Sequence, residues 1–175
     1  QKERMSNEEL IEKYGDWVTV GKPRSRERNI VTSLELDPHR QEAHNIKLQA
    51  KYRKMEENEV RYETINCEDA DYIIVAYGSS ARIAQKTMEL AREKGHKVGI
   101  FRLITLFPFP KNEISALADK VKGFLAVEMS AGQMIDDVKL AVNGKVPAEH
   151  YGRYGGVIHS PEEVLHALEE KIIGG

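Results

Sequence analysis

The sequence predicts an α/β fold with three layers, in which helices cover both faces of a mostly parallel sheet of about five strands. Three observations lead to this prediction. Short apolar runs alternate along the chain with segments of helical period. Several of these runs are continuously apolar, as central parallel strands are. The segments between them are long enough for right-handed helical crossovers, which join parallel strands.

Composition narrows the function classes before any motif is considered. The 175 residues carry 26 basic and 28 acidic side chains, a formal net charge of -2, so no field over the whole chain favours nucleic acid or an anionic membrane. No apolar run approaches the roughly 18 residues of a membrane span, and the first residues lack the apolar region of a signal peptide. We expect a cytoplasmic protein with neither nucleic acid nor membrane as partner.

Residues that could bind metal are few. Cys67 is the only cysteine, which excludes an intrachain disulfide, a thiolate zinc site and an iron–sulfur cluster bound by this chain alone. We interpret Cys67 as a small buried or half-buried residue. The six histidines show no metal-ligand spacing and are interpreted as structural. We therefore expect no metal site.

Two segments precede the α/β domain, which is predicted over residues 59–175. Residues 1–36 are polar and predicted to be an irregular arm or interdomain linker. Its basic run GKPRSRERN, residues 21–29, is either a solvated connector or a docking surface, and Trp17 favours docking because an exposed tryptophan usually needs a partner surface. Residues 37–58 are predicted to form a charged helix that begins with Asp37 as N-cap and Pro38.

The elements of the α/β domain follow from the period of its apolar residues and from its helix end signals. In order they are an alternating edge strand 60–65, a central strand 72–76, a helix 81–94 with Gly95 as C-cap, a strand 97–104, a helix carrying Ile114 to Val121 and ended by Gly123, a strand 124–127, a helix carrying Met134 to Val142, one more strand within 148–156, and a last helix capped by Ser160 and Glu163.

Ligands approach the carboxyl ends of parallel strands in such folds, so the loops after Ala76, Leu103 and Val127 are the informative ones. The first holds Gly78, Ser79, Ser80 and Arg82 at the start of a helix. Backbone N–H groups, two hydroxyls and a guanidinium could bind an anion there. The alternative is that a serine only serves as the helix N-cap, because neither GxGxxG nor GxxxxGK[ST] is present.

The other two loops also leave alternatives open. The second contains Phe107, Pro108 and Phe109, either as a loop folded onto its own core or as a stiff hydrophobic plug for an interface. In the third, Glu128 could be a catalytic base, an orienting group, or an acceptor for loop N–H groups. We favour the acceptor role because no second carboxylate or histidine lies at a telling spacing. We assign no catalytic residue.

Several motifs in the same order resemble the C-terminal half of the α subunit of 2-oxoacid:ferredoxin oxidoreductases, nearest the branched-chain 2-oxoisovalerate type. They are LDPHRQEAHNIKLQAKYRKMEE, EDADYIIVAYGSSARIAQKTMELAREKGHKVGIFRLITLFPFP, VKGFLAVEMSAGQMIDDVKLAVNG and YGRYGG. The resemblance covers roughly residue 30 to the end. It implies a fold like the C-terminal domain of transketolase, in agreement with the pattern of strands and helices.

The resemblance also implies an activity, which this chain cannot perform alone. Such enzymes decarboxylate a 2-oxoacid on thiamine diphosphate with magnesium, pass electrons through iron–sulfur clusters to ferredoxin, and transfer the acyl group to coenzyme A. The family's YPITPSS-like stretch and its GDG motif do not occur in this sequence. The implied partners are an N-terminal pyrimidine-binding domain of the same subunit, a β subunit with the thiamine diphosphate motif, and an iron–sulfur subunit or ferredoxin.

The motifs are then expected to shape an interface around the thiamine site. Phe107, Pro108, Phe109, Glu128 and Gln133 are the expected interface residues, while Gly78, Ser79, Ser80 and Arg82 could contact coenzyme A. Three alternatives stay open: a 2-oxoglutarate substrate, a free-standing flavodoxin-like nucleotide-binding module, and a scaffold domain without a ligand.

Overall fold

The computed structural model describes residues 4–15 and 33–174, and the chain forms two compact units, residues 1–48 and 49–175. The first unit contains helix α1 (Asn7–Tyr14), which corrects the prediction of an irregular arm. A capping box stabilises the start of this helix: the Ser6 backbone N–H donates to Glu9 Oε2 at 2.7 Å, and the Glu9 N–H donates to Ser6 Oγ at 3.2 Å.

Trp17 and the basic run 21–29 lie outside the described residues. The predicted limits 1–36, 37–58 and 59–175 stay predictions.

Helix α2 (Pro38–Asn58) begins as the sequence predicts. Asp37 Oδ1 accepts hydrogen bonds from the backbone N–H groups of His39 at 2.9 Å and Arg40 at 3.2 Å, which is the N-cap arrangement. The helix has no buried residue. No helix among the described residues is long and apolar enough to cross a membrane.

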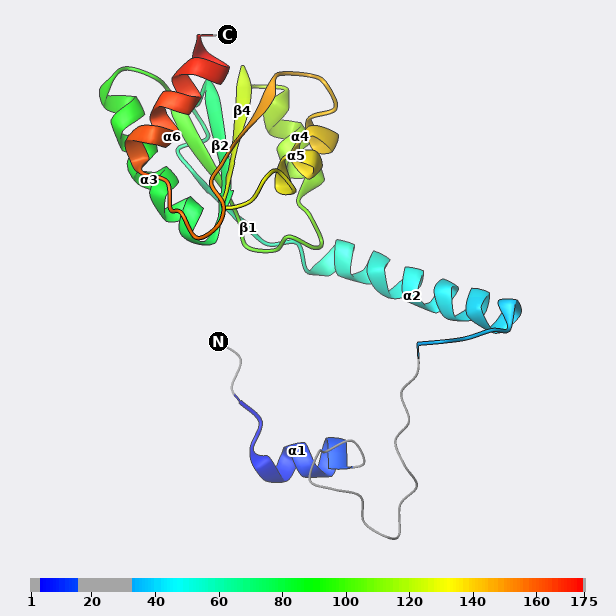
Figure 1. Ribbon diagram of the computed structural model, residues 1–175. Coiled ribbons are helices and arrows are strands. Elements are labelled where there is room, and N and C mark those ends of the chain that lie inside the picture. The colour runs from blue at the N-terminus through cyan, green and yellow to red at the C-terminus, as the bar shows by residue number, and fades with distance from the viewer. Residues whose placement is uncertain (1–3, 16–32, 175) are drawn as a thin grey trace. The chain divides into compact units, whose positions relative to one another are not determined.

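The second unit is built on a five-stranded sheet in the order β1-β3-β2-β4-β5. Strand β1 pairs antiparallel with β3, and all other neighbours are parallel. The sheet confirms the predicted fold class and the predicted edge position of β1 (Figure 1). The strands are β1 (Tyr62–Ile65), β2 (Tyr72–Tyr77), β3 (Val98–Leu103), β4 (Gly123–Glu128) and β5 (Ala148–Gly152).

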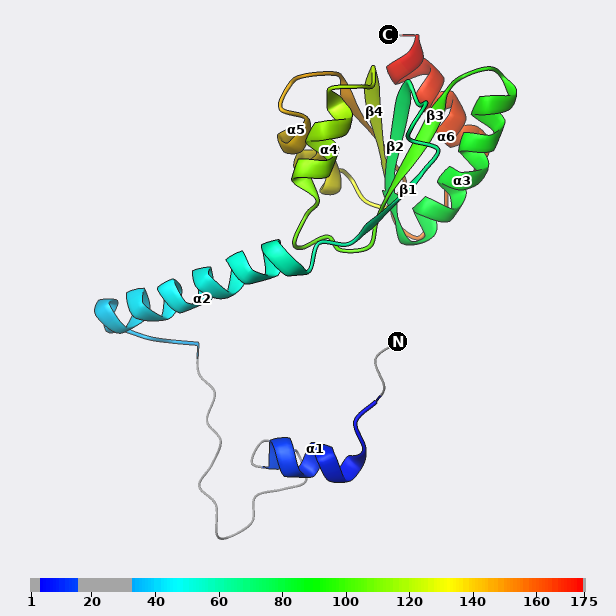
Figure 2. The same ribbon diagram turned by 180° about the vertical axis from the view of Figure 1, so that it is seen from behind.

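Helices cover both faces of the sheet, as Figures 1 and 2 show from opposite sides. Helix α3 (Gly78–Glu93), helix α6 (Pro161–Leu168) and the π-helical turn η2 (Glu169–Ile173) lie on one face, and α4 (Lys111–Ala118) and α5 (Met134–Val142) lie on the other. Successive strand residues point to opposite faces. Ile74 therefore packs in the cluster under α3 and α6, and Ile73 in the cluster under α4 and α5. Burial on both faces explains the continuously apolar strands.

Two predicted helix ends are wrong by a few residues. Helix α4 ends at Ala118, and Gly123 is the first residue of β4 instead of a helix stop. A Cβ on Gly123 would lie 2.8 Å from Ile172 Cγ2, so glycine is needed here for close packing of the C-terminal turn on the strand. The C-cap of α3 is Lys94, and Gly95 follows it with φ 89°.

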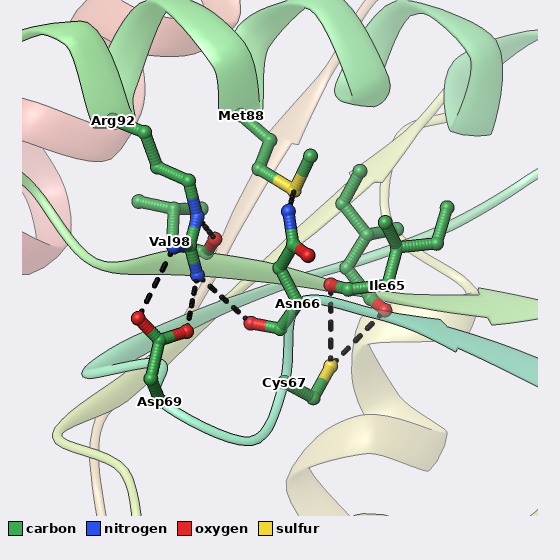
Figure 3. A network of polar contacts seen from close by, with 8 residues as sticks. Ile65, Asn66, Cys67, Asp69, Met88, Arg92 and Val98 are labelled. Carbon is green, nitrogen blue, oxygen red and sulfur yellow. Dashed lines mark hydrogen bonds and ion pairs between the residues drawn. The ribbon is translucent and has the colours of Figure 1, made fainter.

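Arg92 holds together the amino edge of the sheet, where the parallel strands begin (Figure 3). Its guanidinium donates to the Val98 carbonyl at 2.7 Å, to the Asn66 carbonyl at 2.9 Å, and to both Asp69 carboxylate oxygens at 2.7 and 3.2 Å. The pKa of Asp69 is lowered, chiefly by its hydrogen bond to Arg92.

Half-buried Cys67 lies in the same turn, with its Sγ 3.2 Å from the Ile100 carbonyl oxygen, and burial raises the pKa of its thiol. The turn before β2 is thus tied to α3 and β3.

Candidate functional site

The loops predicted to be informative leave the sheet at one edge. Strands β3, β2, β4 and β5 are adjacent and parallel, with Tyr77 in register with Leu103 and Val127 in register with Tyr151. We name residues 78–82, 104–110, 129–133 and 153–159, which follow these strands, the carboxyl edge. The α3 crossover covers one face and the α5 crossover the other (Figure 1). From β2 the chain crosses to β3 on one side, and from β4 it crosses to β5 on the other side. The loops after β2 and β4 therefore lie on either side of the topological switch point, which is the usual ligand position in open α/β sheets.

The first loop is shorter than predicted, because helix α3 begins directly at Gly78. Its N-cap is Tyr77, which has no side-chain oxygen in a capping hydrogen bond, so the expected serine N-cap is wrong. Gly78 has φ 55°, a conformation that favours glycine. Ser79 and Arg82 are exposed while Ser80 is buried. The start of α3 therefore keeps backbone N–H groups free of a side-chain cap.

The second loop is folded partly onto its own core and partly exposed. Phe109 is half-buried and packs against the core under α4 and α5, with Pro108 and Pro110 buried beside it. Thr105 Oγ1 donates to the Pro108 carbonyl at 3.0 Å and accepts from the Arg61 N–H at 3.0 Å, which fixes the loop to the start of β1. Phe107 instead is 55% exposed, and its ring contacts that of Tyr52 edge-on with the ring centroids 5.8 Å apart.

Glu128, at the end of β4, is fully buried and accepts hydrogen bonds from the loop that follows it. Its Oε2 accepts from Ser130 Oγ at 2.6 Å and from the Gln133 and Met134 N–H groups at 3.2 and 3.1 Å, and its Oε1 accepts from the Ile135 N–H at 3.2 Å. Burial acts to raise its pKa, but these hydrogen bonds outweigh burial and the pKa is lowered. Of the three roles considered, this geometry is that of an acceptor for loop N–H groups, here at the N-terminus of α5.

The loop after β4 and the end of β5 are packed too closely for larger residues at two glycines. A Cβ on Gly152 would collide with the Ser130 carbonyl oxygen, and one on Gly132 would lie 3.2 Å from Ile135 Cγ2. His150 lies beneath this loop with Nε2 3.5 Å from Glu128 Oε1. Sequence reasoning assigned no role to His150 or Gly152, because their importance comes from close packing between segments that are distant in sequence.

The segment after β5 contains a buried polar group that the sequence also failed to indicate. His159 is 2% exposed, and neither of its ring nitrogens has a hydrogen-bond partner among the described residues. Its ring centroid lies 6.0 Å from that of Tyr151. Burial lowers the pKa of His159; nearby Glu163 acts in the opposite direction, and Arg153 lowers it further. Its position directly before the Ser160 N-cap gave no sign of burial.

The described residues do not contain a cluster of three or more histidine, cysteine, aspartate or glutamate side chains able to hold a metal ion. The carboxyl edge instead combines an uncapped helix start, an outward aromatic ring and a tightly hydrogen-bonded carboxylate. This arrangement can bind an anion or a protein surface.

Comparison with known proteins agrees with this description. Residues 70–164 match the family of pyruvate:ferredoxin oxidoreductase core domain II. The chain is 44% identical over 165 residues to the ketoisovalerate oxidoreductase subunit VorB of Methanothermobacter thermautotrophicus, a match over 93% of this chain and 46% of the relative. It is 34% identical over 101 residues to the 2-oxoglutarate synthase subunit KorA of Methanothermobacter marburgensis, a match over 58% of this chain and 27% of the relative. The chain spans about half the length of the VorB relative.

Solved structures share the fold. A 2-oxoglutarate:ferredoxin oxidoreductase from Magnetococcus marinus, with 2-oxoglutarate, coenzyme A and succinyl-CoA bound, superposes with a TM-score of 0.60 at 19% identity over 78% of this chain and 24% of that chain. A split-gene transketolase superposes with a TM-score of 0.56 at 15% identity over 65% of this chain and 41% of that chain. The transketolase match confirms the fold expected from the sequence resemblance. Taken with the VorB relative, the match over residues 70–164 shows that the chain belongs to the pyruvate:ferredoxin oxidoreductase core domain II family, which is found in subunits of 2-oxoacid:ferredoxin oxidoreductases.

Proposed function

We propose that this chain is the structural and interface domain of a thiamine diphosphate-dependent 2-oxoacid:ferredoxin oxidoreductase that acts on a branched-chain 2-oxoacid in the cytoplasm. The observation that carries the proposal is the 44% identity to VorB over 165 residues. The complete enzyme would convert the 2-oxoacid to an acyl-coenzyme A and reduce ferredoxin. The KorA match supports 2-oxoglutarate as the alternative substrate.

The residues of this chain do not fit the redox cofactors of such an enzyme. An iron–sulfur cluster needs several cysteine ligands, and Cys67 is the only cysteine in the sequence, with Sγ directed at backbone carbonyls. Thiamine diphosphate, magnesium and the clusters would therefore be held by the rest of the enzyme, namely by a pyrimidine-binding domain of the same subunit, a β subunit and an iron–sulfur subunit or ferredoxin. The domain itself would perform no chemical step.

The five expected interface residues would then act in two ways. Phe107 and Gln133 are exposed and would contact a partner directly. Pro108, half-buried Phe109 and Glu128 lie inside this chain and would shape the loops that present the exposed pair. The hydrogen bonds of Glu128 to three backbone N–H groups support this indirect role, because they fix the loop 129–133.

A chimera tests the function. This chain would replace the matched part of M. thermautotrophicus VorB, and the purified chimera would be combined with the remaining subunits of that enzyme. We expect ferredoxin reduction with 2-oxoisovalerate in excess of that with 2-oxoglutarate. A chimera that assembles and turns over only 2-oxoglutarate would show that 2-oxoglutarate, and not the branched-chain 2-oxoacid, is the substrate. A chimera that binds no other subunit would refute the proposed function.

Contact with coenzyme A at Gly78, Ser79, Ser80 and Arg82 is a separate part of the proposal. The uncapped start of α3 supports it, because helix N-termini attract phosphate. Arg82 also supports it, since this exposed guanidinium takes part in none of the ion pairs of the described residues. Calorimetric titration of this chain with about 1 mM coenzyme A should release heat that Arg82→Ala reduces. Absence of heat with wild type would exclude direct binding by the domain alone.

A further inference from the structure

Large apolar side chains are exposed on three loops of the carboxyl edge, namely those after β3, β4 and β5. Phe107 is 55% exposed, and Tyr154 and Ile158 are each 65% exposed. We name this set the carboxyl-edge apolar surface. Its members are Ile104, Leu106, Phe107, Met129, Tyr154, Val157 and Ile158. Single exposed apolar residues are normal in folded proteins, but several gathered at one edge of a sheet indicate an interaction surface.

The fold brings these residues to one edge although they are far apart in sequence. They follow β3, β4 and β5, and these strands run parallel to one another within the same sheet. The loops are also held in place from within. Thr105 fixes the loop that carries Phe107, and Glu128 fixes the loop that follows Met129. A surface on fixed loops loses little conformational freedom when a partner covers it.

The opposite edge of the same sheet lacks such a surface. In the described turns 66–71, 94–97, 119–122 and 143–147, no large apolar side chain is exposed. These turns carry ion pairs instead, among them Lys122 with Asp71 at 3.1 Å and Lys145 with Asp119 at 2.8 Å. Exposed apolar side chains are therefore concentrated at the carboxyl edge and are not spread evenly over the loops at both edges of the sheet.

The surface continues onto the last turns of α2. Tyr52 packs edge-on against Phe107, and both side chains are otherwise exposed. A groove is lined by residues from the end of α2, the start of β1 and the segment after β3, among them Arg53, Tyr62, Phe109 and Lys111. Helix α2 has no buried residue, and isolated helices of this kind owe most of their stability to packing against a neighbour. Tyr52 therefore adds to the exposed apolar area beside Phe107.

We propose that the carboxyl-edge apolar surface is a domain interface covered by the part of a full-length subunit that this chain does not match. The argument for this occupant is length. The matches cover 46% and 43% of the two Methanothermobacter VorB subunits, so about half of each relative has no counterpart here. This inference rests on the proposed function, because it requires the chain to act as part of a longer subunit. The other half would present a complementary apolar face.

Side-chain footprinting of the VorB chimera tests the interface directly. Hydroxyl radicals would label exposed side chains in the isolated 175-residue chain and in the chimera that supplies the unmatched half of M. thermautotrophicus VorB. We expect labelling of Phe107, Met129 and Tyr154 to fall at least about threefold in the chimera, as side chains at the core of an interface lose solvent. Leu140, which is 78% exposed on α5, is the internal control and should keep its labelling.

Variants make the footprint specific. Ile158→Asp with Phe107→Asp in the chimera should restore the labelling of Met129 toward its level in the isolated chain, whereas Leu140→Asp should not. Unchanged labelling of Phe107, Met129 and Tyr154 on going from isolated chain to chimera would overturn the proposal. So would labelling in the isolated chain that falls as its concentration rises, because a second copy would then be the occupant.

Oxidoreductase activity of the same chimera separates the two proposals. An active chimera whose carboxyl edge stays fully labelled would overturn the interface and leave the function standing. An inactive chimera whose Phe107 and Tyr154 are shielded would support the interface and count against the function.

Discussion

The two edges of the sheet are built in opposite ways. At the amino edge, Arg92 joins two backbone carbonyls and the Asp69 carboxylate, and further ion pairs face solvent. At the carboxyl edge, the buried Glu128 carboxylate accepts hydrogen bonds from backbone N–H groups, while several apolar side chains are exposed. The amino edge is complete in this chain alone. The carboxyl edge holds Glu128 by hydrogen bonds but leaves both ring nitrogens of buried His159 without a hydrogen-bond partner among the described residues, and it exposes apolar side chains. We therefore expect interior changes there to affect stability and exterior changes to affect assembly.

The largest loss of stability is expected from Glu128→Gln. The substitution removes the negative charge and replaces one acceptor oxygen by an NH2 group, which is itself a donor. Backbone N–H groups at the start of α5 that donate to the Glu128 carboxylate would then lose their acceptor. We expect the free energy of unfolding to fall by about 3 kcal/mol. Urea unfolding followed by circular dichroism measures it. Glu149→Gln, at an exposed position of β5, is the control and should change stability by less than about 0.5 kcal/mol. Equal effects of the two substitutions would contradict the assigned role.

Arg92→Ala should have a smaller effect, because water can reach part of the network that it removes. The side chain is 28% exposed and holds the Asn66 carbonyl and Asp69. We expect a loss of about 2 kcal/mol. Arg82→Ala in the same helix should change the free energy of unfolding by less than about 0.5 kcal/mol, because that exposed side chain takes part in no ion pair among the described residues. If Arg82→Ala were as destabilising as Arg92→Ala, the contrast between the edges would fail.

We expect His159 to make the free energy of unfolding depend on pH below neutrality. Because burial holds its folded-state pKa below the ordinary value of 6.5, the unfolded chain binds the proton more readily. The contribution of His159 to stability is therefore complete above pH 6.5 and declines as the pH falls toward the folded-state pKa. Urea unfolding at a series of pH values should show a flatter curve for His159→Phe than for wild type. Parallel curves would show that His159 does not titrate differently on folding.

The smallest effect on stability is expected from Ile158→Asp in the isolated chain. The side chain is 65% exposed, so the free energy of unfolding should change by less than about 0.5 kcal/mol. Thermal unfolding of the isolated chain measures this. A loss comparable with that of Glu128→Gln would mean that Ile158 packs within this domain, and the carboxyl edge would then resemble the amino edge.

Part of the candidate site could be predicted from sequence. The loops after β2, β3 and β4 were located correctly because strand ends follow from apolar period alone. The N-cap of α3 was not predicted correctly, because a serine near a helix start is a capping signal only on average. The helix begins earlier, at Gly78, with Tyr77 as its N-cap. His159 and Gly152 were missed because close packing between distant segments determines their importance.

The sequence by itself determined the fold class. Continuously apolar strands and helices with one apolar face can bury their residues only as a sheet covered on both sides, so the pattern has few solutions. Tertiary structure decided what the pattern leaves open: the antiparallel direction of β1, the burial of Glu128, and the gathering of exposed apolar residues at one edge. These depend on which loops meet in space, and loops that meet across a sheet are separated by whole crossovers in sequence. The local period of apolar residues carries no information about contacts between loops that are distant in sequence.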